Sequence, residues 1–244
     1  IIEPFSATLL ESCSVEFIEK LKKLKKEYNF SIICDEVYCA WYKCGKLFYF
    51  QKYENFFPDI LTLSKSMGGG KSSISAYVAH ESLHDKVYGS INNAFLHTTT
   101  YNGFGEECAT AIEAINILIE ENFQDKVKFV ESSLKSSLKN LKSKFPKKIK
   151  GFKGEGALFG IEFNSPVDMI SSFLDSVDIS FVNDKKKIIS KLYIASISDT
   201  LFQKYNIMTN ISESDNSDFL YISPSLIAEK KHIDYFFESL SNIL

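Results

Sequence analysis

Apolar residues of the N-terminal part recur with the periods of helices and strands. Between residues 14 and 28 they return every three to four positions, at Val15, Ile18, Leu21, Leu24 and Tyr28. This period predicts an amphipathic helix. Short apolar runs of strand length follow at 30–34, 60–64 and 74–79. Because helices and strands alternate, we expect an α/β fold with a mainly parallel sheet.

The helical period returns in the second half of the chain. We expect a long buried helix at 106–121 and an amphipathic, outermost helix at 124–144, which Pro146 ends. Beyond it the pattern predicts strands around glycines at 149–163, a helix at 185–205, a polar loop at 212–218, a strand at 219–223 and a helix at 228–244. We therefore expect part of a large domain at 1–146 and a small α+β domain at 147–244.

Composition excludes several classes of protein. The 244 residues are 45% hydrophobic and 14% aromatic, which is enough for a packed core. The formal charge of -3 offers no positive surplus for nucleic acid, and no apolar run is long enough for a membrane span. All 28 basic residues are lysine, so this chain supplies no guanidinium to pair with a carboxylate.

The cysteines favour a reducing compartment. They lie at Cys13, Cys34, Cys39, Cys44 and Cys108, an odd number without a C-x-x-C pair. This spacing signals neither a disulfide framework nor a zinc site, so we expect no metal and a cytoplasmic location. The chain begins at Ile1 without a methionine and reads as the end of a strand, so we expect it to be the C-terminal part of a longer polypeptide.

Charged residues follow two of the expected strands. Asp35 and Glu36 come after the run at 30–34, and Lys65 comes after the run at 60–64. In open α/β sheets, ligands bind at the carboxyl ends of the strands. The alternatives are an ordinary capping or turn role for the acids and an exposed lysine beside a flexible turn for Lys65.

A glycine-rich run lies just beyond the lysine. Residues 68–72 read Gly-Gly-Gly-Lys-Ser, which invites comparison with a nucleotide phosphate loop. That motif needs its first glycine where this chain has Lys65. We therefore do not expect nucleotide binding here. The aromatic stretch 38–57 is expected to be a hydrophobic loop, packed on its own domain or on a partner subunit.

The combination of these groups matches the needs of pyridoxal phosphate. Its aldehyde requires an amine for a Schiff base, its ring nitrogen requires a carboxylate, and its phosphate requires several donors. Lys65, Asp35 and the hydroxyl-rich turn at 97–103 supply these groups in this order along the chain. We expect pyridoxal 5'-phosphate as the cofactor.

Several segments resemble one known family. They are Glu3-Pro4, Ile33–Tyr38, Gly45–Phe48, Pro58–Gly70, His97–Gly103, Gly154–Glu162 and Phe219–Leu226. In order and spacing they resemble class III pyridoxal-phosphate aminotransferases of the ornithine/acetylornithine type. The resemblance implies the second part of a fold-type I subunit. A first part, with a phosphate loop and an aromatic residue stacked on the cofactor ring, is expected before Ile1.

The resemblance implies roles for particular residues. Lys65 corresponds to the Schiff-base lysine and Asp35 to the partner of the pyridinium nitrogen. Val37 corresponds to the residue packed on the ring face. Each of these three roles is an expectation that follows from the resemblance to the family.

Three further residues complete the implied cofactor site. Tyr38 stands where the family often has glutamine, and its phenol could donate to the ring oxygen. Thr100, with Thr99 beside it, corresponds to the hydroxyl that reaches the phosphate from the neighbouring subunit. We therefore expect a homodimer with composite active sites.

The implied reaction is transamination. A ping-pong cycle through an internal aldimine at Lys65 would move an amino group from an amine or amino acid to a 2-oxo acid. Thr8 and Tyr221 stand where ornithine-type enzymes have a paired Glu and Arg, so neither ornithine nor acetylornithine is assigned as donor, and Tyr221 is either core or pocket lining. The alternatives are an aminomutase, another pyridoxal-phosphate reaction, or an inactive fragment or pseudoenzyme.

Overall fold

The computed structural model describes residues 1–93, 95–164, 179–212 and 218–244, and for residues 179–187 it describes the backbone alone. The described residues form two compact units. The first unit comprises Ile1–Ala7 and Glu11–Gln124, and the second comprises Thr8–Leu10 and Asp125–Leu244. Each unit is described by itself below. The domain boundary expected at residue 146 stays a prediction.

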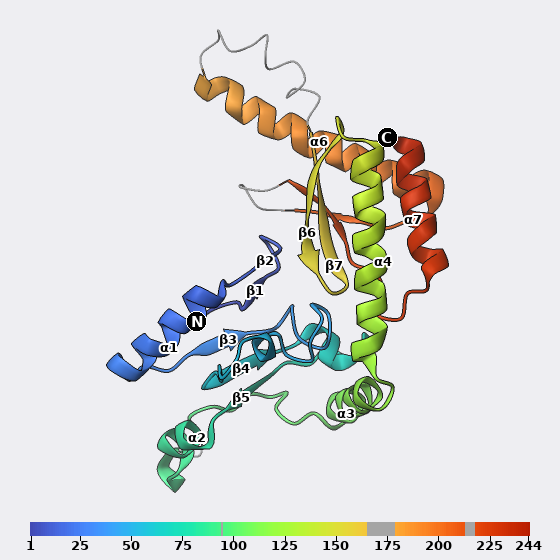
Figure 1. Cartoon of the computed structure of the whole chain (residues 1–244). Coiled ribbons are helices and arrows are strands. Elements are labelled where there is room, and N and C mark those ends of the chain that lie inside the picture. The colour runs from blue at the N-terminus through green and yellow to red at the C-terminus, as the bar shows by residue number, and fades with distance from the viewer. Residues whose placement is uncertain (94, 165–178, 213–217) are drawn as a thin grey trace. The chain divides into compact units, whose positions relative to one another are not determined.

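A three-stranded sheet lies at the centre of the first unit (Figure 1). Its strands are β3 (Ile33–Asp35), β4 (Ile60–Leu63) and β5 (Ala76–Ala79). β3 and β4 run parallel, and Ile2 forms a further parallel bridge to Cys34. β5 runs antiparallel to β4. The mixed arrangement of helices and strands confirms the α/β class, with parallel pairing at the two strands that carry the expected site.

A half-buried polar contact fixes the alignment of β3 and β4. The Asp59 carboxylate accepts a hydrogen bond from the Ile32 backbone N–H at 2.7 Å and from Lys25 Nζ at 2.5 Å. The Asp59 N–H in turn donates to the Ile32 carbonyl at 2.9 Å. These bonds join the starts of the two strands and so set their register, in which Asp35 pairs with Thr62.

Helix α1 (Val15–Tyr28) confirms the helix expected at the same place. Ser14 begins it by accepting a hydrogen bond from the Phe17 N–H at 3.1 Å. Asn29 ends it in the left-handed conformation, with φ of 51°. Only Ile18 of the expected apolar face is fully buried.

The first unit also contains the helices α2 (Glu81–Tyr88) and α3 (Gly105–Glu120) and the short helices η1 (Tyr49–Lys52), η2 (Lys65–Gly68) and η3 (Ile91–Asn93). The sequence pattern did not predict α2.

The expectation that α3 is buried is wrong for one face. Ala111 and Leu118 are buried, but Ile112 and Ile119 are 59% and 58% exposed. Within the described residues, α3 packs on η2 and its outer face stays uncovered.

The aromatic stretch packs on its own unit, as one of the two expected alternatives states. Trp41, Tyr49 and Phe56 are buried. The Tyr49 ring lies 5.3 Å from that of Phe5, centroid to centroid. Tyr53 donates its hydroxyl to the carbonyl oxygen of Cys13 at 2.8 Å. The small hairpin of β1 (Phe5–Ser6) and β2 (Glu11–Ser12) is thereby attached to this stretch.

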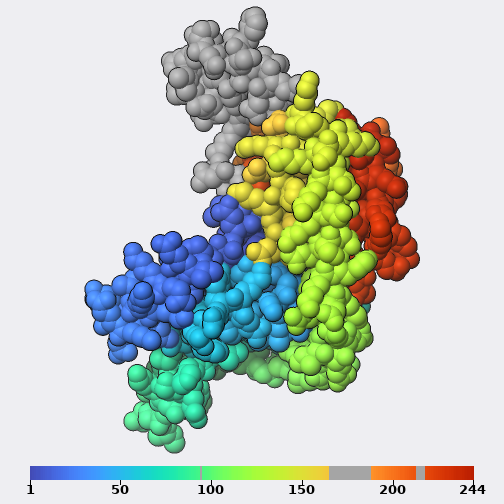
Figure 2. All heavy atoms as spheres, in the orientation of Figure 1, coloured from blue at the N-terminus to red at the C-terminus, as the bar shows by residue number. Residues whose placement is uncertain are grey.

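The second unit contains an antiparallel sheet in the order β6-β7-β9-β8. Its elements are α4 (Phe123–Lys144), β6 (Ile149–Glu155), β7 (Leu158–Phe163), α6 (Ile179–Tyr205), β8 (Asn210–Ile211), β9 (Phe219–Ile222) and α7 (Lys230–Ile243). Apart from β8, these elements were expected. In Figure 2, α7 (red) lies beside part of α4 (yellow-green), and residues of both helices line one cavity. Most of the loop expected at 212–218 lies outside the described residues.

Helix α4 is amphipathic, as its period predicts. It buries one residue per turn, at Val127, Val130, Leu134, Leu138 and Leu141. Phe129, which was expected on the same face, is 46% exposed, because it lies between the turns that face the core.

Gly154 permits the close approach of β6 and β7. Its φ is +130°, and an added Cβ would lie 2.6 Å from Phe159 Cα. We expect Gly154→Ala to lower the free energy of unfolding by about 1–3 kcal/mol through backbone strain and overlap. The control is Gly151→Ala in the same strand, where a Cβ would meet only the Glu162 side chain, at 3.3 Å. Equal losses in urea unfolding of the two variants would contradict this account.

Candidate active site

The ends of two parallel strands define the candidate site. β3 ends at Asp35, and β4 ends two residues before Lys65. The Glu36 N–H donates to the Thr62 carbonyl at 3.1 Å, which keeps the two chains adjacent beyond the last residue of β3. Asp35 and Lys65 therefore leave the sheet at the same edge, which is where the sequence pattern places a ligand.

Lys65 has an unusual backbone conformation. It opens η2 with φ of 50°, in the left-handed region that side chains other than glycine seldom adopt. Its side chain is exposed, and Nζ lies 4.8 Å from the centroid of the Tyr38 ring. Gly69 ends η2, also left-handed, at φ of 60°. The turn after Lys65 thus uses the glycines that the sequence supplies.

A cavity of about 360 Å³ surrounds the lysine. Its lining consists of Ser64, Lys65, Ser72, Ser73, Ile74 and Ser75. Ser64 donates its hydroxyl to the Ile74 carbonyl at 3.0 Å. The buried Ser72 hydroxyl has no hydrogen-bond partner in the part of the chain that the structure describes. The cavity therefore combines an amine with several hydroxyls, one of which is available to a ligand.

The serines of this cavity were not singled out from the sequence. Three of them occur within four positions, 72–75, just after the glycines. That density of hydroxyls just after the expected Schiff-base lysine and its glycines was the available signal. The Thr62 hydroxyl, opposite Asp35, is also buried and without a partner among the described residues.

Asp35 and Val37 form a local turn at the end of β3. The Val37 N–H donates to Asp35 Oδ1 at 3.1 Å, which holds the carboxylate in one orientation. Both residues are half-buried. Asp35 Oδ2 has no hydrogen-bond partner within the described ranges. This oxygen is therefore available to a donor at the sheet edge.

Glu36 points into the core, away from the oxygen that Asp35 offers at the sheet edge. The sequence pattern did not predict this structural role. It is 0% exposed, and its two carboxylate oxygens accept hydrogen bonds from the Tyr49 N–H at 2.5 Å and the Phe50 N–H at 2.6 Å. Burial raises the pKa of this carboxyl to about 7. The sequence did contain a signal for this orientation. Side chains of an extended segment alternate between its two faces, so Glu36 is expected to point away from the face shared by Asp35 and Val37.

Thr99 and Thr100 do not line the cavity that contains Lys65. The Thr99 hydroxyl donates to Asn102 Oδ1 at 3.1 Å, and Thr100 is exposed. Their role in a neighbouring subunit's site stays a prediction.

Thr8 and Tyr221 meet, although 213 positions separate them. The Tyr221 hydroxyl donates to the Thr8 backbone carbonyl at 3.1 Å, and both residues belong to the second unit. Tyr221 also lines a cavity of about 180 Å³ with residues that include Met208 and Phe236. The sequence comparison of these two positions therefore concerns a true pair in space.

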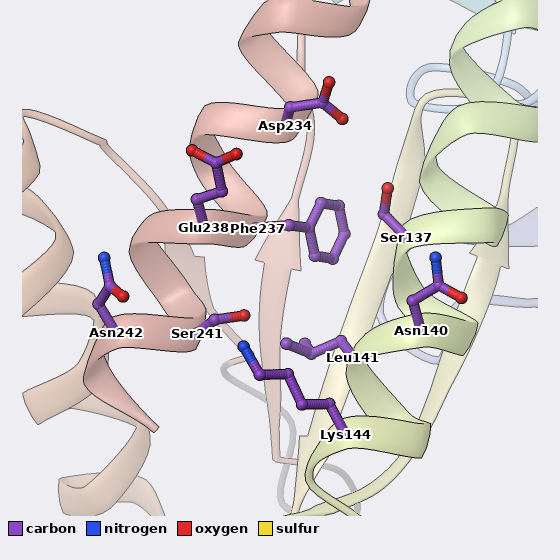
Figure 3. A pocket seen from close by; sticks show the side chains of 9 residues that line it. All are labelled: Ser137, Asn140, Leu141, Lys144, Asp234, Phe237, Glu238, Ser241 and Asn242. Atoms are coloured by element: carbon purple, nitrogen blue, oxygen red, sulfur yellow. The ribbon is translucent and has the colours of Figure 1, made fainter.

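A third cavity, of about 440 Å³, lies between α4 and α7 (Figure 3). It is lined mainly by polar side chains, among them Lys144, Asp234 and Glu238. Asp234 pairs with Lys230 at 2.7 Å. None of the residues that the sequence singled out lines this cavity.

The cysteines at positions 13, 34, 39, 44 and 108 are all free. Within the described ranges, no group of three or more His, Cys, Asp or Glu side chains is arranged to hold a metal ion. Among the helices that the structure describes, none has the length and apolar character needed to cross a bilayer.

The fold and a family model define the class. The structure corresponds to part of a fold-type I pyridoxal-phosphate transferase. The family model described as Aminotransferase class-III matches residues 1–244, so the chain belongs to the class III aminotransferase family. Enzymes of this family depend on pyridoxal phosphate.

Solved structures agree on the fold. Ornithine delta-aminotransferase of Plasmodium falciparum superposes with a TM-score of 0.74 at 23% identity, over 98% of this chain and 54% of that one. An S-selective transaminase from Arthrobacter sp. gives 0.76 at 20% identity, over 98% and 48%. An omega-transferase from Vibrio fluvialis JS17 gives 0.72 at 18%, over 98% and 52%. The chain spans about half the length of these proteins.

Proposed function

We propose that the protein containing this chain is a pyridoxal-phosphate-dependent aminotransferase. It would move an amino group from an amine or amino acid to a 2-oxo acid in ping-pong order. The observation that carries this proposal is the placement of the Lys65 amine and the Asp35 carboxylate at adjoining ends of two parallel strands. Membership of the class III family supplies the context.

The residues present fit the cofactor. Lys65 offers an amine to the aldehyde, Asp35 Oδ2 offers an acceptor to the ring nitrogen, and the Ser72 hydroxyl is a donor without a partner in the described structure. When bound, pyridoxal phosphate supplies a ring that withdraws electrons from the substrate carbon. Val37, whose N–H is bonded to Asp35, is proposed to pack on that ring.

Two residues of this chain would then do the chemistry. Asp35 would hold a proton on the ring nitrogen, because an ionised carboxylate stabilises the cationic form of its partner. Lys65 Nζ would bind the cofactor and, when its amine is free, would take a proton from the substrate and return it to a neighbouring atom. A lysine held beside the substrate would make this transfer effectively intramolecular.

The rest of the site is proposed to come from elsewhere. By their resemblance to the family positions, Thr99 and Thr100 are proposed to offer their hydroxyls to the phosphate of a neighbouring subunit, so we propose a homodimer. Because the chain spans about half the length of its structural relatives, further cofactor contacts are proposed to come from residues outside it. A cytoplasmic location stays a prediction.

Half-reactions test the proposed function. The natural protein, loaded with pyridoxal phosphate, is mixed with single amines or amino acids without a 2-oxo acid. We expect a suitable donor to remove the visible absorbance of the bound cofactor, and a 2-oxo acid added after removal of the donor to restore it. If a donor instead turns over to an isomer without any 2-oxo acid, the reaction is that of an aminomutase. No spectral response across ω-amines, α-amino acids and diamines would refute transamination.

A further inference from the structure

Tyr38 meets Lys65 with its ring rather than with its hydroxyl. Lys65 Nζ lies 4.8 Å from the ring centroid, within the range of about 6 Å over which an ammonium is attracted to an aromatic face. The Tyr38 hydroxyl forms no hydrogen bond within the described ranges. The donor role expected for this phenol, toward the ring oxygen of the cofactor, stays a prediction.

The face of the Tyr38 ring is the electron-rich group that lies next to the Lys65 amine. Lys65 forms no ion pair with any carboxylate in the part of the chain that the structure describes. Burial, and secondarily the nearby Cys44, raises the pKa of the Tyr38 phenol, so the ring stays neutral. The attraction is therefore to the electron-rich ring face and not to a phenolate.

The backbone around Tyr38 is held on both sides. On one side, the Val37 N–H bonds to Asp35, and on the other, the Ala40 N–H bonds to the Glu36 carbonyl at 3.2 Å. Glu36 itself is anchored by two short bonds to the N–H groups of residues 49 and 50. A ring on such a supported turn keeps its place when the long lysine side chain moves.

We propose that the face of Tyr38 is a docking position for the free ammonium of Lys65, holding it at the sheet edge whenever the lysine carries no cofactor. Tyr38 is thus a positioning residue that acts through Lys65. The contact itself does not depend on the proposed function, but its use in the reaction does. Its cost is slower reaction of the amine, because the lysine must leave the ring face before it can react.

Trace labelling of the cofactor-free natural protein tests the contact. The protein is exposed briefly to acetic anhydride, and mass spectrometry measures acetylation of Lys65 relative to Lys71 in the same molecule. An exposed cation–π contact of about 0.5–1 kcal/mol corresponds to roughly a 2- to 5-fold change in rate. We expect Tyr38→Leu to label Lys65 roughly 2- to 5-fold faster, and Tyr38→Phe to label it at the native rate.

A second variant that keeps the shape of the ring controls for misfolding of Tyr38→Leu. Replacing Tyr38 with 3,4,5-trifluorophenylalanine keeps the ring but weakens the negative charge of its face. We expect this variant to label like Tyr38→Leu. Labelling of Lys65 at the native rate in both would overturn the proposal, as would fast labelling in Tyr38→Phe, which would assign the effect to the hydroxyl.

A cofactor experiment separates the two levels of inference. Pyridoxal phosphate is added to the same variants, and the visible band of the bound cofactor is followed. If no band forms but the labelling contrast persists, the proposed function fails and the Tyr38 contact stands. If the band forms normally and the labelling contrast is absent, the contact fails and the proposed function stands.

Discussion

Replacing Lys65 with alanine is expected to abolish covalent retention of pyridoxal phosphate by the natural protein that contains this chain. Transaminase activity should fall by on the order of 10³-fold or more, because the variant loses both the nucleophile and the base. Borohydride reduction followed by peptide mass spectrometry gives the measurement. The native protein should carry the reduced adduct on Lys65, and the variant should carry none.

Lys71→Ala is the matched control for this experiment. Lys71 is exposed and lies six positions further on, beyond the same glycines, in the Gly-Lys-Ser run that resembles a phosphate loop. It does not line the cavity that contains Lys65. We expect it to keep the adduct and most of the activity. A reducible adduct in Lys65→Ala, or its loss only in Lys71→Ala, would show that the wrong lysine has been assigned.

Glu36→Ala is expected to be the most destabilising substitution at the sheet edge. It leaves the N–H groups of Tyr49 and Phe50 without their acceptors in a buried position. Each unsatisfied buried donor costs about 1–3 kcal/mol, so we expect a loss of about 3–5 kcal/mol in the free energy of unfolding at pH 5. Urea unfolding measures it. Exposed Glu27 supplies the control, since Glu27→Ala should change stability by less than about 0.5 kcal/mol.

The cost of removing Glu36 should depend on pH. Burial raises its pKa from 4.5 to about 7 in the folded protein, so between these values the native state binds a proton that the unfolded state lacks. The stabilisation is complete below about pH 4.5 and is lost as pH rises through about 7. The native protein should therefore lose stability relative to Glu36→Ala, by on the order of 3 kcal/mol, between pH 5 and 8. A constant difference would mean that the carboxylate is ionised throughout.

Local patterns predicted most elements, because their information is contained in neighbouring residues. The period at 14–28 predicted α1, and the cap residues Ser14 and Asn29 lie where it begins and ends. Strand bounds were less accurate: the run at 30–34 became β3 at Ile33–Asp35. Its first residues lie outside the ladder, since tertiary hydrogen bonds through Asp59 decide where pairing starts.

Burial of α3 could not be predicted from its apolar pattern. A pattern shows which residues would favour contact, but it does not show whether a neighbour exists. Ile112 and Ile119 remain exposed because no described element covers them. The apolar pattern of α3 therefore indicates a surface whose burial would be favourable.

The candidate site was predictable only where chemistry required a particular residue type. An amine and a carboxylate at strand ends identify Lys65 and Asp35, and the register of β3 and β4 brings these strand ends to one edge. The contact of Lys65 with the Tyr38 ring depends on side-chain direction, which spacing does not give. Glu36 was ambiguous for the same reason, since the two adjacent acids differ only in which way they face.

The bond between Tyr221 and Thr8 has a consequence for sequence change. Its donor is a side chain, but its acceptor is a main-chain carbonyl, which every residue possesses. Mutation can therefore alter the side chain at position 8 freely without removing the contact, whereas Tyr221→Phe removes it at once. Selection on this pairing would act at one end only, so the two positions need not change together during divergence.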